Sequence, residues 1–328
     1  MSTQAHTDEG GPLFDLKLAS RALYPTLSAE LRERTDTDIE LRPLGHVVPA
    51  FSPEDATVIR RRIAWQSARG LTARWLSPTE ARDLEPGLPE ALQGAGWFPD
   101  DHHVNPTAVT QGLAGAVTRL GGQVRVACPV SSLLLDGERV AGVRTAEGPI
   151  AAGVVVLAAG AWSGEFQQSV GIPIPVLPAK GQIAVARLPE PALRHVAYEQ
   201  IYVIPRATGE HIIGSTVEYV GFDKAVTVEG IAALLADATR IVPALRDAEM
   251  VTSYGCLRPA STDGKPLLGP VPGRPGLVLA TGHFRNGILL APITGQLIAE
   301  YILSGRPSMP LESFRPDRPF LPGSPPQD

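Results

Sequence analysis

Signatures of several common enzyme classes are missing from this 328-residue sequence. No Gly-x-Gly-x-x-Gly motif occurs, so the usual dinucleotide-binding turn is absent, and no Gly-x-Ser-x-Gly motif points to a serine hydrolase. The adjacent residues His102 and His103 make a poor metal pair, and no spacing of cysteine, histidine and acidic residues supports a metal site. We therefore expect no metal.

Cysteines, basic clusters and long apolar runs are also scarce. The two cysteines, Cys128 and Cys256, are too few for a disulfide framework, which favours a reducing compartment and a cytoplasmic location. A net charge of −5, with no basic run longer than Arg60–Arg62, argues against nucleic acid as the main partner. The N-terminus is polar and no uninterrupted apolar run reaches the ~18 residues that span a bilayer, so we expect neither a signal peptide nor a transmembrane segment.

The composition that remains is that of a globular protein. Hydrophobic residues make up 44% of the chain and charged residues 19%. The 33 glycines and 32 prolines lie between apolar segments, which indicates many short elements joined by turns. The length allows one large domain or two of medium size.

The most informative stretch lies near the C-terminus. An apolar strand at Leu277–Ala280 runs into Gly282 and a short polar loop, after which a helix with apolar positions at helical spacing continues to Gly305. The pair Asn286-Gly287 allows a sharp turn and a close approach of the backbone. Such a strand–glycine–helix corner suits an anionic or electron-rich ligand at the helix N-terminus, although a plain strand-to-helix connection is the alternative.

A second corner of the same kind lies in the middle of the chain. Val154–Leu157 is a continuous apolar run, typical of a strand that is buried on both faces, and it leads into Ala158–Trp162. Two such corners at the carboxyl edge of one sheet would lie side by side, where ligands bind in open α/β folds.

Periodicity and capping residues predict the remaining elements. After Pro307 we expect a proline-rich tail extended over the surface. The predicted helices cover 16–31 with a kink or restart at Pro25, 53–70, 78–85, 106–120 and 227–241. The predicted strands cover 39–51 with breaks at Pro43 and Gly45, 94–98, 124–126, a hairpin at 131–143, and antiparallel strands at 182–185, 201–205 and 211–217.

Taken together, these motifs are similar to those of glycine oxidases in the D-amino-acid oxidase superfamily of flavoproteins. The resemblance implies a two-domain α+β / α/β fold, with a Rossmann-like FAD-binding domain and a substrate domain built on an antiparallel sheet. The motifs that carry it are Phe14–Pro25, Val154–Ser163, Tyr202–Arg206, Gly255–Pro259 with Asp263–Pro266, and Gly282–Gly295. The implied ranges are 10–38, 104–170 and 260–306 for the FAD domain, 39–103 and 171–259 for the substrate domain, and 307–328 for the tail.

One departure from the family pattern is large. The family opens with a strand, a Gly-x-Gly-x-x-Gly turn and a helix, which hold the flavin pyrophosphate and the adenosine ribose. Met1 aligns after this N-terminal βαβ unit, so ~40 residues or more are missing from the pattern. A misassigned start codon and a real truncation both explain this. We favour the first, because loss of the central strands would cost more than a fold stabilised by about 5–15 kcal/mol could absorb.

The resemblance assigns roles to five substrate-side residues. It makes Arg258 the arginine that binds the substrate carboxylate, a role that its planar fork of donors suits. It places the Tyr202 hydroxyl near the substrate and Arg285 near the flavin, where a positive charge would stabilise the reduced ring. Gln200 and Val217 would line a small substrate pocket. The alternatives are a structural ion pair for Arg258, a core position for Tyr202 and a backbone anchor for Arg285.

The flavin contacts that the resemblance implies are mostly made by the backbone. One residue would lie at the adenine, three along the ribose and pyrophosphate, and seven around the isoalloxazine ring. In that order these are Val130; Ala158, Gly160 and Trp162; and Gly282, His283, Phe284, Asn286, Gly287, Ile288 and Leu289.

The implied activity is FAD-dependent oxidative deamination of glycine, or of a similar small amine such as sarcosine or a small D-amino acid. The products would be an imine, then glyoxylate and ammonia, with oxygen reduced to hydrogen peroxide, and the imine could supply thiamine thiazole synthesis. The expected partners are the small amino acid and O2, with a homo-oligomer and transfer to thiazole synthase left open. The alternatives are a D-amino-acid dehydrogenase that reduces a quinone, and a non-catalytic remnant that does not hold FAD.

Overall fold

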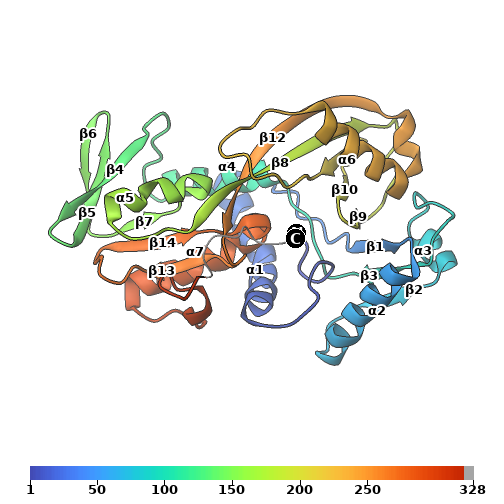
Figure 1. Cartoon of the computed structure of the whole chain (residues 1–328), viewed down its shortest axis with the longest axis horizontal. Helices are drawn as coiled ribbons and strands as arrows, with labels where there is room; N and C mark the ends of the chain where they lie inside the picture. Colours follow the sequence, from blue (N-terminus) through green and yellow to red (C-terminus); the bar gives the residue numbers. More distant parts are fainter. Residues whose placement is uncertain (321–328) are drawn as a thin grey trace.

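An eight-stranded sheet forms one end of the molecule (Figure 1) in a computed structural model that describes residues 1–320. Its strand order is β12-β8-β11-β10-β9-β1-β3-β2, and neighbouring strands are antiparallel except for β1 and β9, which run parallel. The strands are β1 (His46–Ala50), β2 (Arg74–Leu76), β3 (Gly94–Phe98), β8 (Val176–Arg187), β9 (Val196–Tyr198), β10 (Tyr202–Pro205), β11 (Glu210–Gly214) and β12 (Glu249–Ser261).

Two three-stranded sheets form the other end (Figure 1). In the first, β13 (Leu267–Pro270) pairs antiparallel with β14 (Leu277–Thr281), which pairs parallel with β7 (Val155–Leu157). The second is a meander of β4 (Val130–Asp136), β5 (Arg139–Thr145) and β6 (Gly148–Ala151). Leu157 and Leu279 of the first sheet and Leu133 and Val140 of the second share one buried core.

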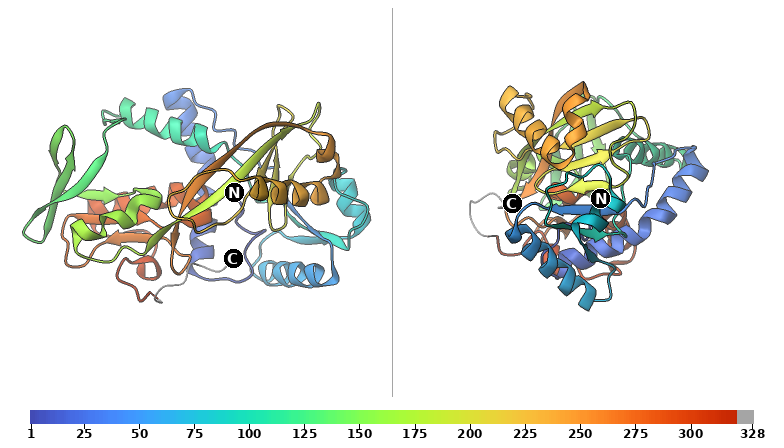
Figure 2. Two further views of the ribbon diagram at one scale, coloured as in Figure 1. Left: turned by 45° about the horizontal axis from the view of Figure 1, so that its top comes forward. Right: turned by 90° about the vertical axis from the view of Figure 1, so that its right-hand side faces the viewer.

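The helices cover these sheets and connect the two ends (Figures 1 and 2). Two long helices, α1 and α7, pack against each other near the middle, and Leu16 of α1 meets Leu290 and Leu297 of α7 in a buried cluster. The helices are α1 (Pro12–Thr35), α2 (Pro53–Ala68), α3 (Pro78–Leu84), α4 (Pro106–Arg119), α5 (Gln167–Val170), α6 (Val228–Ile241) and α7 (Gly287–Ser304), with 3₁₀ turns η1 (Gly160–Phe166), η2 (Pro243–Asp247), η3 (Phe284–Asn286) and η4 (Glu312–Phe314).

The capping residues seen in the structure confirm most of the predicted helix starts. The Ser52 and Ser77 side chains each accept a backbone hydrogen bond three residues on, and Asp55 and Glu80 return one, so both form full capping boxes. Thr227 caps α6 in the predicted place. The antiparallel strands between 176 and 214 are also confirmed, although β9 was not predicted.

Several element predictions were wrong. Residues 124–126 form no strand, and the Val126 side chain is 84% exposed, because no strand pairs with this segment. Of the strand predicted at 39–51, the part before the predicted break at Gly45 does not form, and β1 begins at His46, directly after Gly45 turns the chain with φ of 72°. Helix α1 does not restart at Pro25, which lies inside it, so the restart that was one alternative there does not occur. The run at 154–157 is not buried on both faces, since β7 lies at the edge of its sheet and Val156 is 39% exposed.

The C-terminal segment also differs from an extended tail. Leu311 and Phe314 are buried against the α1–α7 cluster, and Arg318 forms an ion pair of 2.8 Å with Asp263. Residues 308–320 are therefore anchored to the core, and the remainder of the predicted tail, 321–328, lies outside the described residues. The domain ranges stay a prediction, although the strands of the large sheet fall at 46–98 and 176–261, close to the ranges predicted for the substrate domain.

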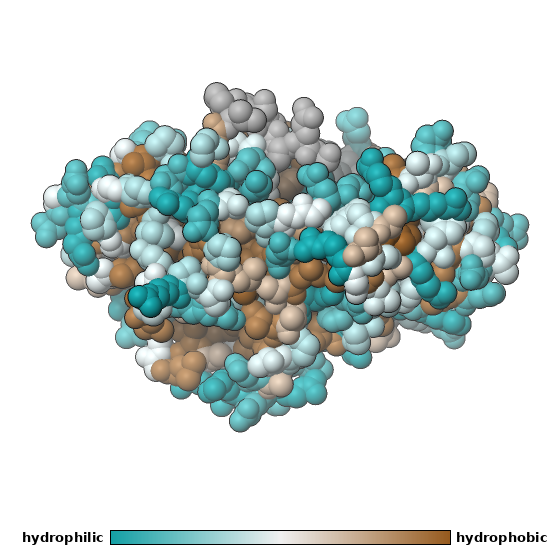
Figure 3. Space-filling model, turned by 90° about the horizontal axis from the view of Figure 1, so that it is seen from below, coloured by the Kyte–Doolittle hydropathy of each residue, from teal (hydrophilic) through white to brown (hydrophobic). Residues whose placement is uncertain are grey.

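Within residues 1–320, one helical segment is long and apolar enough to cross a membrane, judged by length and composition alone. This segment is Phe284–Ser304, which consists of η3 and α7. Within it Leu290, Ile293 and Leu297 pack into the core between α1 and the β13–β14 hairpin, as expected for a core helix. Seen from below, hydrophobic side chains gather near the middle of the molecule, and the two ends are mostly hydrophilic (Figure 3).

Candidate active site

The two predicted glycine corners lie side by side. Strands β7 and β14 pair in parallel register, so the chain leaves both at the same carboxyl edge of the sheet. The Thr281 hydroxyl donates to the Gly160 carbonyl oxygen over 3.3 Å and lies 2.7 Å from the Ser163 hydroxyl, which ties the corners together. Gly160 has φ of 54°, and a Cβ there would meet nothing within 4 Å, so its backbone faces open space.

Helix α7 begins at this edge and points its N-terminus outward from the second corner. Asn286 takes the N-cap position, but no side chain caps the first turn. Helix α1 fixes the turn, because the Ser20 hydroxyl donates to the Leu289 carbonyl oxygen over 2.6 Å and the Tyr24 hydroxyl donates to that of Ile288. The uncapped amides and the helix dipole together favour an electronegative ligand group at this position.

His283 anchors the loop between β14 and α7. Its Nε2 lies 3.0 Å from the Thr294 hydroxyl, on the second turn of α7. Burial lowers the pKa of His283 to about 4, so the ring is neutral at pH 7. A bridge between His283 and Ala260 joins this loop to the end of β12, which carries Arg258 two residues earlier.

Arg258 is a half-buried guanidinium held by neutral groups. Its Nη1 donates to the Ser215 hydroxyl over 3.0 Å, and its Nη2 donates to the carbonyl oxygens of Lys180, over 3.1 Å, and of Thr216. Its Nε is buried without a partner, and among residues 1–320 no carboxylate pairs with it. Burial above all, and then the charge of Arg285, lowers the pKa of Arg258. The expected alternative, a structural ion pair, is therefore not what these residues form.

Tyr202 belongs to the same hydrogen-bonded group as Arg258. Its hydroxyl bonds to Ser215, which also accepts from Arg258, and burial raises the pKa of Tyr202 to about 12. Gly214 pairs with Tyr202 across β10 and β11, and a Cβ at 214 would lie 2.6 Å from the tyrosine hydroxyl. Only glycine lets this ring lie across the neighbouring strand.

The guanidinium groups of Arg258 and Arg285 both lie near the Phe284 ring. The Cζ atoms of the two arginines are 5.6 and 5.3 Å from the centre of its ring. The residue adopts φ of 48°, a left-handed conformation that is strained for a bulky side chain. Arg285 also hydrogen-bonds the Tyr198 hydroxyl, which brings a second tyrosine into the group.

Tyr198 was missed by the sequence reasoning. The β9–β10 hairpin pairs Tyr198 directly with Tyr202, and the two rings lie 6.1 Å apart. A spacing of four residues across a tight turn places both side chains on one face, so the pattern Tyr-x-x-x-Tyr could have signalled it once β9 was recognised. His6, whose ring contacts Tyr198, carried no sequence signal at all.

The other predicted substrate-side residues lie less centrally. Gln200 is exposed in the turn between β9 and β10, and its backbone N–H donates to Glu199 over 2.9 Å. Val217 is half-buried and follows Thr216, whose carbonyl oxygen accepts from Arg258. No contact joins either side chain to Arg258 or Tyr202 among the described interactions, so their pocket roles stay predictions.

The flavin-contacting residues predicted between 130 and 162 do not all lie at the candidate site. Ala158 and Trp162 flank Gly160 at the first corner, and Trp162 is 46% exposed and stacks on Phe222 at 5.8 Å. Val130 opens β4 in the separate three-stranded meander, where it lines a cavity of about 370 Å³ beside Cys128. The structure therefore brings the two corners and Arg258 together, and leaves Val130 in another sheet.

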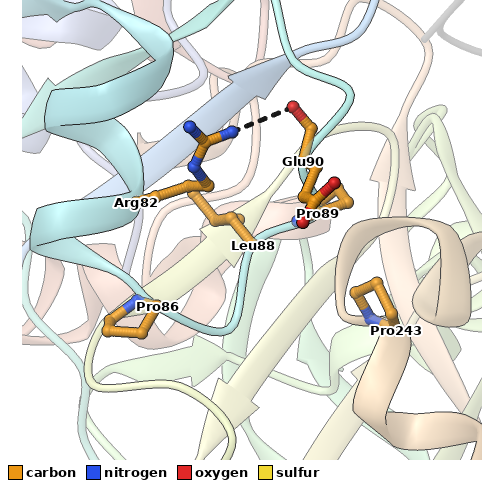
Figure 4. A pocket seen from close by; sticks show the side chains of 6 residues that line it. All are labelled: Arg82, Pro86, Leu88, Pro89, Glu90 and Pro243. Atoms are coloured by element: carbon orange, nitrogen blue, oxygen red, sulfur yellow. Dashed lines mark hydrogen bonds between the residues drawn. The ribbon is translucent and has the colours of Figure 1, made fainter.

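A larger cavity of about 760 Å³ lies elsewhere (Figure 4). It is lined by Arg82, Pro86, Leu88, Pro89, Glu90 and Pro243, none of which belongs to the group around Arg258. Arg82 donates to the Glu90 carbonyl oxygen over 3.1 Å, so its charged group is already engaged. This cavity between α3 and η2 offers no pair of reactive groups and is not the candidate site.

Comparison with known proteins identifies the family. The model of the FAD dependent oxidoreductase family matches residues 3–301. The chain belongs to this family. Glycine oxidase from Geobacillus kaustophilus (strain HTA426) is 36% identical over 305 residues, which are 92% of this chain and 81% of that protein. The bifunctional protein ThiO/ThiG of Trichormus variabilis is 37% identical over 91% of this chain and 45% of that longer protein.

The solved structures agree with the sequence comparison. The crystal structure of glycine oxidase from Geobacillus kaustophilus matches with a TM-score of 0.93 at 35% identity, over 97% of this chain and 86% of that one. The predicted resemblance, the two-domain mixed fold and the assignment as an FAD-dependent amino-acid oxidase are confirmed. The roles of individual residues stay predictions.

The residues present fit the flavin-ring side of the FAD that the family uses, whereas no Gly-x-Gly-x-x-Gly turn is present for its pyrophosphate. The open backbone at Gly160 leaves room for a group at the first corner, and the uncapped start of α7 presents amides at the second. The guanidinium groups of Arg258 and Arg285 lie beside Phe284 at the same edge, where they favour negative charge on a ring or substrate.

Proposed function

We propose that this enzyme oxidises glycine, or a small secondary amine such as sarcosine, to the imine and releases hydrogen peroxide. The observation that supports this most is Arg258, a half-buried guanidinium without a carboxylate partner among residues 1–320, at the edge where the two glycine corners meet. Such a group accepts a substrate carboxylate in a bidentate pair. The small-substrate preference follows the glycine oxidases that the chain resembles.

The positive charge of the site favours the neutral amine form of the substrate. The pKa of Tyr202 is raised to about 12, so this hydroxyl stays protonated and uncharged at pH 7. Arg258 and Arg285 add positive charge beside it. A bound ammonium group is disfavoured in this field and loses its proton to solvent, which leaves the amine lone pair free. No dedicated base is needed in this proposal.

Orientation is the other contribution of the protein. Arg258 holds the carboxylate, and the Tyr202 hydroxyl is placed through Ser215 to contact the same end of the substrate. When bound, FAD supplies the acceptor for the two electrons that leave the α-carbon. The imine leaves the site and hydrolyses to glyoxylate and ammonia when the substrate is glycine, or to glyoxylate and methylamine when it is sarcosine. Because one relative is the fused ThiO/ThiG protein, we include transfer of the imine to thiazole synthase in the proposal.

The test is made on the full chain with added FAD. We expect a bound flavin spectrum, bleaching of that spectrum by glycine under argon, and stoichiometric oxygen uptake and peroxide formation in air. Bleaching without oxygen uptake, but with reduction of an artificial acceptor, would identify the dehydrogenase instead. A preparation that acquires no flavin spectrum would reject catalysis by this chain.

A further inference from the structure

The Arg258 side chain crosses the neighbouring strand β8 to reach its backbone acceptors. Arg258 on β12 pairs with Ala179 on β8, so its side chain lies on the face of the sheet that carries Ala179 and Gly181. A Cβ at Gly181 would collide with Nη2 of Arg258, so the guanidinium lies directly over this glycine. There Nη2 donates to the carbonyl oxygens of Lys180, over 3.1 Å, and of Thr216. The direction of the guanidinium therefore depends on where these two carbonyl groups are fixed.

An ion pair on the opposite face of the sheet fixes both carbonyl groups. Because side chains alternate along a strand, Lys180 points away from the Arg258 face, and its Nζ lies 2.8 Å from Oε2 of Glu218. The Lys180 side chain is 2% exposed and that of Glu218 is 27% exposed. The backbones of the two residues also exchange hydrogen bonds of 2.8 and 3.0 Å. This bridge ties β8 to residues 216–218, the segment that supplies the second carbonyl group.

The Glu218 carboxylate is held by further hydrogen bonds. Its Oε1 accepts from the Gln182 amide over 2.8 Å and from the Thr216 hydroxyl. Burial opposes ionisation of Glu218, but these hydrogen bonds and that from Lys180 outweigh burial and lower its pKa, so the carboxylate is charged at pH 7. The bond from Thr216 is the important one, because the carbonyl oxygen of the same residue accepts from Arg258.

This arrangement orders Arg258 without neutralising it. The pair of Lys180 and Glu218 carries no net charge and lies across the sheet. The acceptors that contact Arg258 itself are the Ser215 hydroxyl and two carbonyl oxygens, all uncharged. A guanidinium has five N–H donors, so the Nε–H and one N–H of Nη1 remain for a ligand. A carboxylate placed directly on Arg258 would occupy these donors and cancel the charge that a substrate requires.

We propose that Glu218, paired with Lys180, is a positioning residue for substrate binding: it aligns the carbonyl groups of Lys180 and Thr216 so that the free donors of Arg258 face the substrate carboxylate. This inference rests on the proposed function, in which Arg258 binds that carboxylate. Glu218 does not contact the substrate and acts only through Arg258. A carboxylate held equally in the ground state and the transition state affects KM, so loss of the alignment should raise KM and leave kcat nearly unchanged.

Binding of a non-oxidisable carboxylate to Glu218→Gln tests the proposal. Methoxyacetate has the shape of sarcosine with an oxygen in place of the nitrogen. Glutamine keeps the size of Glu218 but removes the charge that pairs with Lys180. Titration of the full chain in the presence of FAD should show an about tenfold weaker Kd for methoxyacetate, the size of one charge-assisted hydrogen bond. KM for glycine should rise by a similar factor with little change in kcat.

A second variant and a matched control separate positioning from folding. Thr216→Val removes only the hydroxyl that bonds to Glu218 and should weaken methoxyacetate binding by a smaller factor, so the test does not depend on the folding of Glu218→Gln. Glu210 pairs with Arg187 over 2.7 Å at the other end of β8, and its side chain is 28% exposed, close to the value for Glu218. Glu210→Gln should therefore leave Kd and KM unchanged.

A double-mutant cycle shows whether Glu218 acts through Arg258. In an Arg258→Ala background, Glu218→Gln should cause no further loss of methoxyacetate affinity, whereas a general structural defect would add to the loss. The proposal is overturned by an unchanged Kd in both Glu218→Gln and Thr216→Val, by an equal loss in Glu210→Gln, or by an equal effect of Glu218→Gln with and without Arg258. Failure of the proposed function would appear differently, because Arg258→Ala itself would then bind methoxyacetate as tightly as the unsubstituted chain.

Discussion

Arg258 shows how one residue can be costly to the fold and useful to a substrate. Its Nη atoms bond to Ser215 and to two backbone carbonyls, but its Nε has no partner and its charge has no counter-ion among residues 1–320. A fold selected only for stability would pair such a charge, because an unpaired buried charge is destabilising. In the proposed function, the substrate carboxylate is the counter-ion of Arg258.

Replacing Arg258 with alanine is therefore expected to damage substrate binding far more than folding. Loss of a buried charged partner costs about 2–5 kcal/mol, so kcat/KM for glycine should fall by ~30-fold or more, mainly through KM. The flavin spectrum should be retained. Steady-state kinetics and flavin absorbance of the variant check this, and an unchanged KM would show that Arg258 does not contact the substrate.

His283 gives a prediction about pH at the same scale. Its pKa is lowered from 6.5 to about 4 by burial, so between these values the unfolded chain binds a proton that the folded chain refuses. Stability should fall as the pH falls from 6.5 to 4 and then level off. At about 1.4 kcal/mol per unit, the contribution of this ring reaches about 3 kcal/mol.

The variant His283→Gln isolates this contribution. Glutamine can still reach Thr294 but does not titrate, so the difference in unfolding free energy between the two proteins should change over that pH range and be constant above it. Urea titrations at pH 7, 6, 5 and 4 measure the difference. The other buried histidines are common to both proteins and cancel. Parallel curves at all four values would contradict the assignment.

At the scale of elements, the segment before α1 depends on a single acceptor. Asp101 follows β3 and binds three consecutive backbone N–H groups of residues 3–5. Asp101→Ala should release this segment, because within residues 1–320 Asp101 is the recorded acceptor of these N–H groups. Hydrogen exchange of the amides of residues 3–8 should then rise sharply, while exchange in the eight-stranded sheet stays low.

The neighbouring Asp100→Ala serves as the matched control. Asp100 is half-buried but accepts none of the segment's N–H groups, so its replacement should leave exchange in residues 3–8 unchanged. If Asp101→Ala protected these amides as well as the unsubstituted chain does, the segment would be held by α2 alone.

The limits of sequence reasoning at this scale have physical causes. Elements with local signals were predicted well: the capping boxes at Ser52 and Ser77, the strand at Gly94–Phe98, and the two glycine corners. Elements whose burial depends on strands distant in sequence were not predicted well. Val154–Leu157 has the composition of a central strand, but its burial depends on which strands lie beside it, and only β14 does.

The same reasoning explains which site residues were found. Arg258 and Tyr202 stand in motifs with a recognisable order, so the resemblance carried them. Tyr198 and His6 stand in no motif, and their contact depends on the segment before α1, which Asp101, about a hundred residues away in sequence, orders. Contacts over such separations leave no periodicity for a single sequence to reveal.

At the scale of the whole molecule, the candidate site exists only where the two halves meet. The corners at Gly160 and Gly282 belong to the small β13-β14-β7 sheet and its flanking turns, whereas Arg258 and Tyr202 belong to the eight-stranded sheet (Figure 1). The bridge from Ala260 to His283 joins them directly. A ligand bound at the corners therefore contacts both halves, and its binding should stabilise the whole chain rather than one part.

This coupling leads to a prediction for Gly160. A valine there would fill the open space at the first corner and adopt an unfavourable φ of 54°, which costs about 1–2 kcal/mol. Gly137 has nearly the same backbone, φ of 59° and no neighbour within 4 Å, but lies in the β4–β5 hairpin. Without cofactor the two valine variants should therefore lose similar stability. They should differ only in how much added FAD stabilises them.

Thermal unfolding at increasing FAD concentrations distinguishes Gly160→Val from Gly137→Val. At a hundredfold excess over Kd, bound FAD should stabilise the original chain and Gly137→Val by about 2.7 kcal/mol, in one cooperative transition for both halves. Gly160→Val should show no such gain and no bound flavin spectrum. If Gly160→Val were stabilised as much as Gly137→Val, the first corner would not face the cofactor. If FAD raised the unfolding temperature of only one half, the bridge between Ala260 and His283 would not couple them.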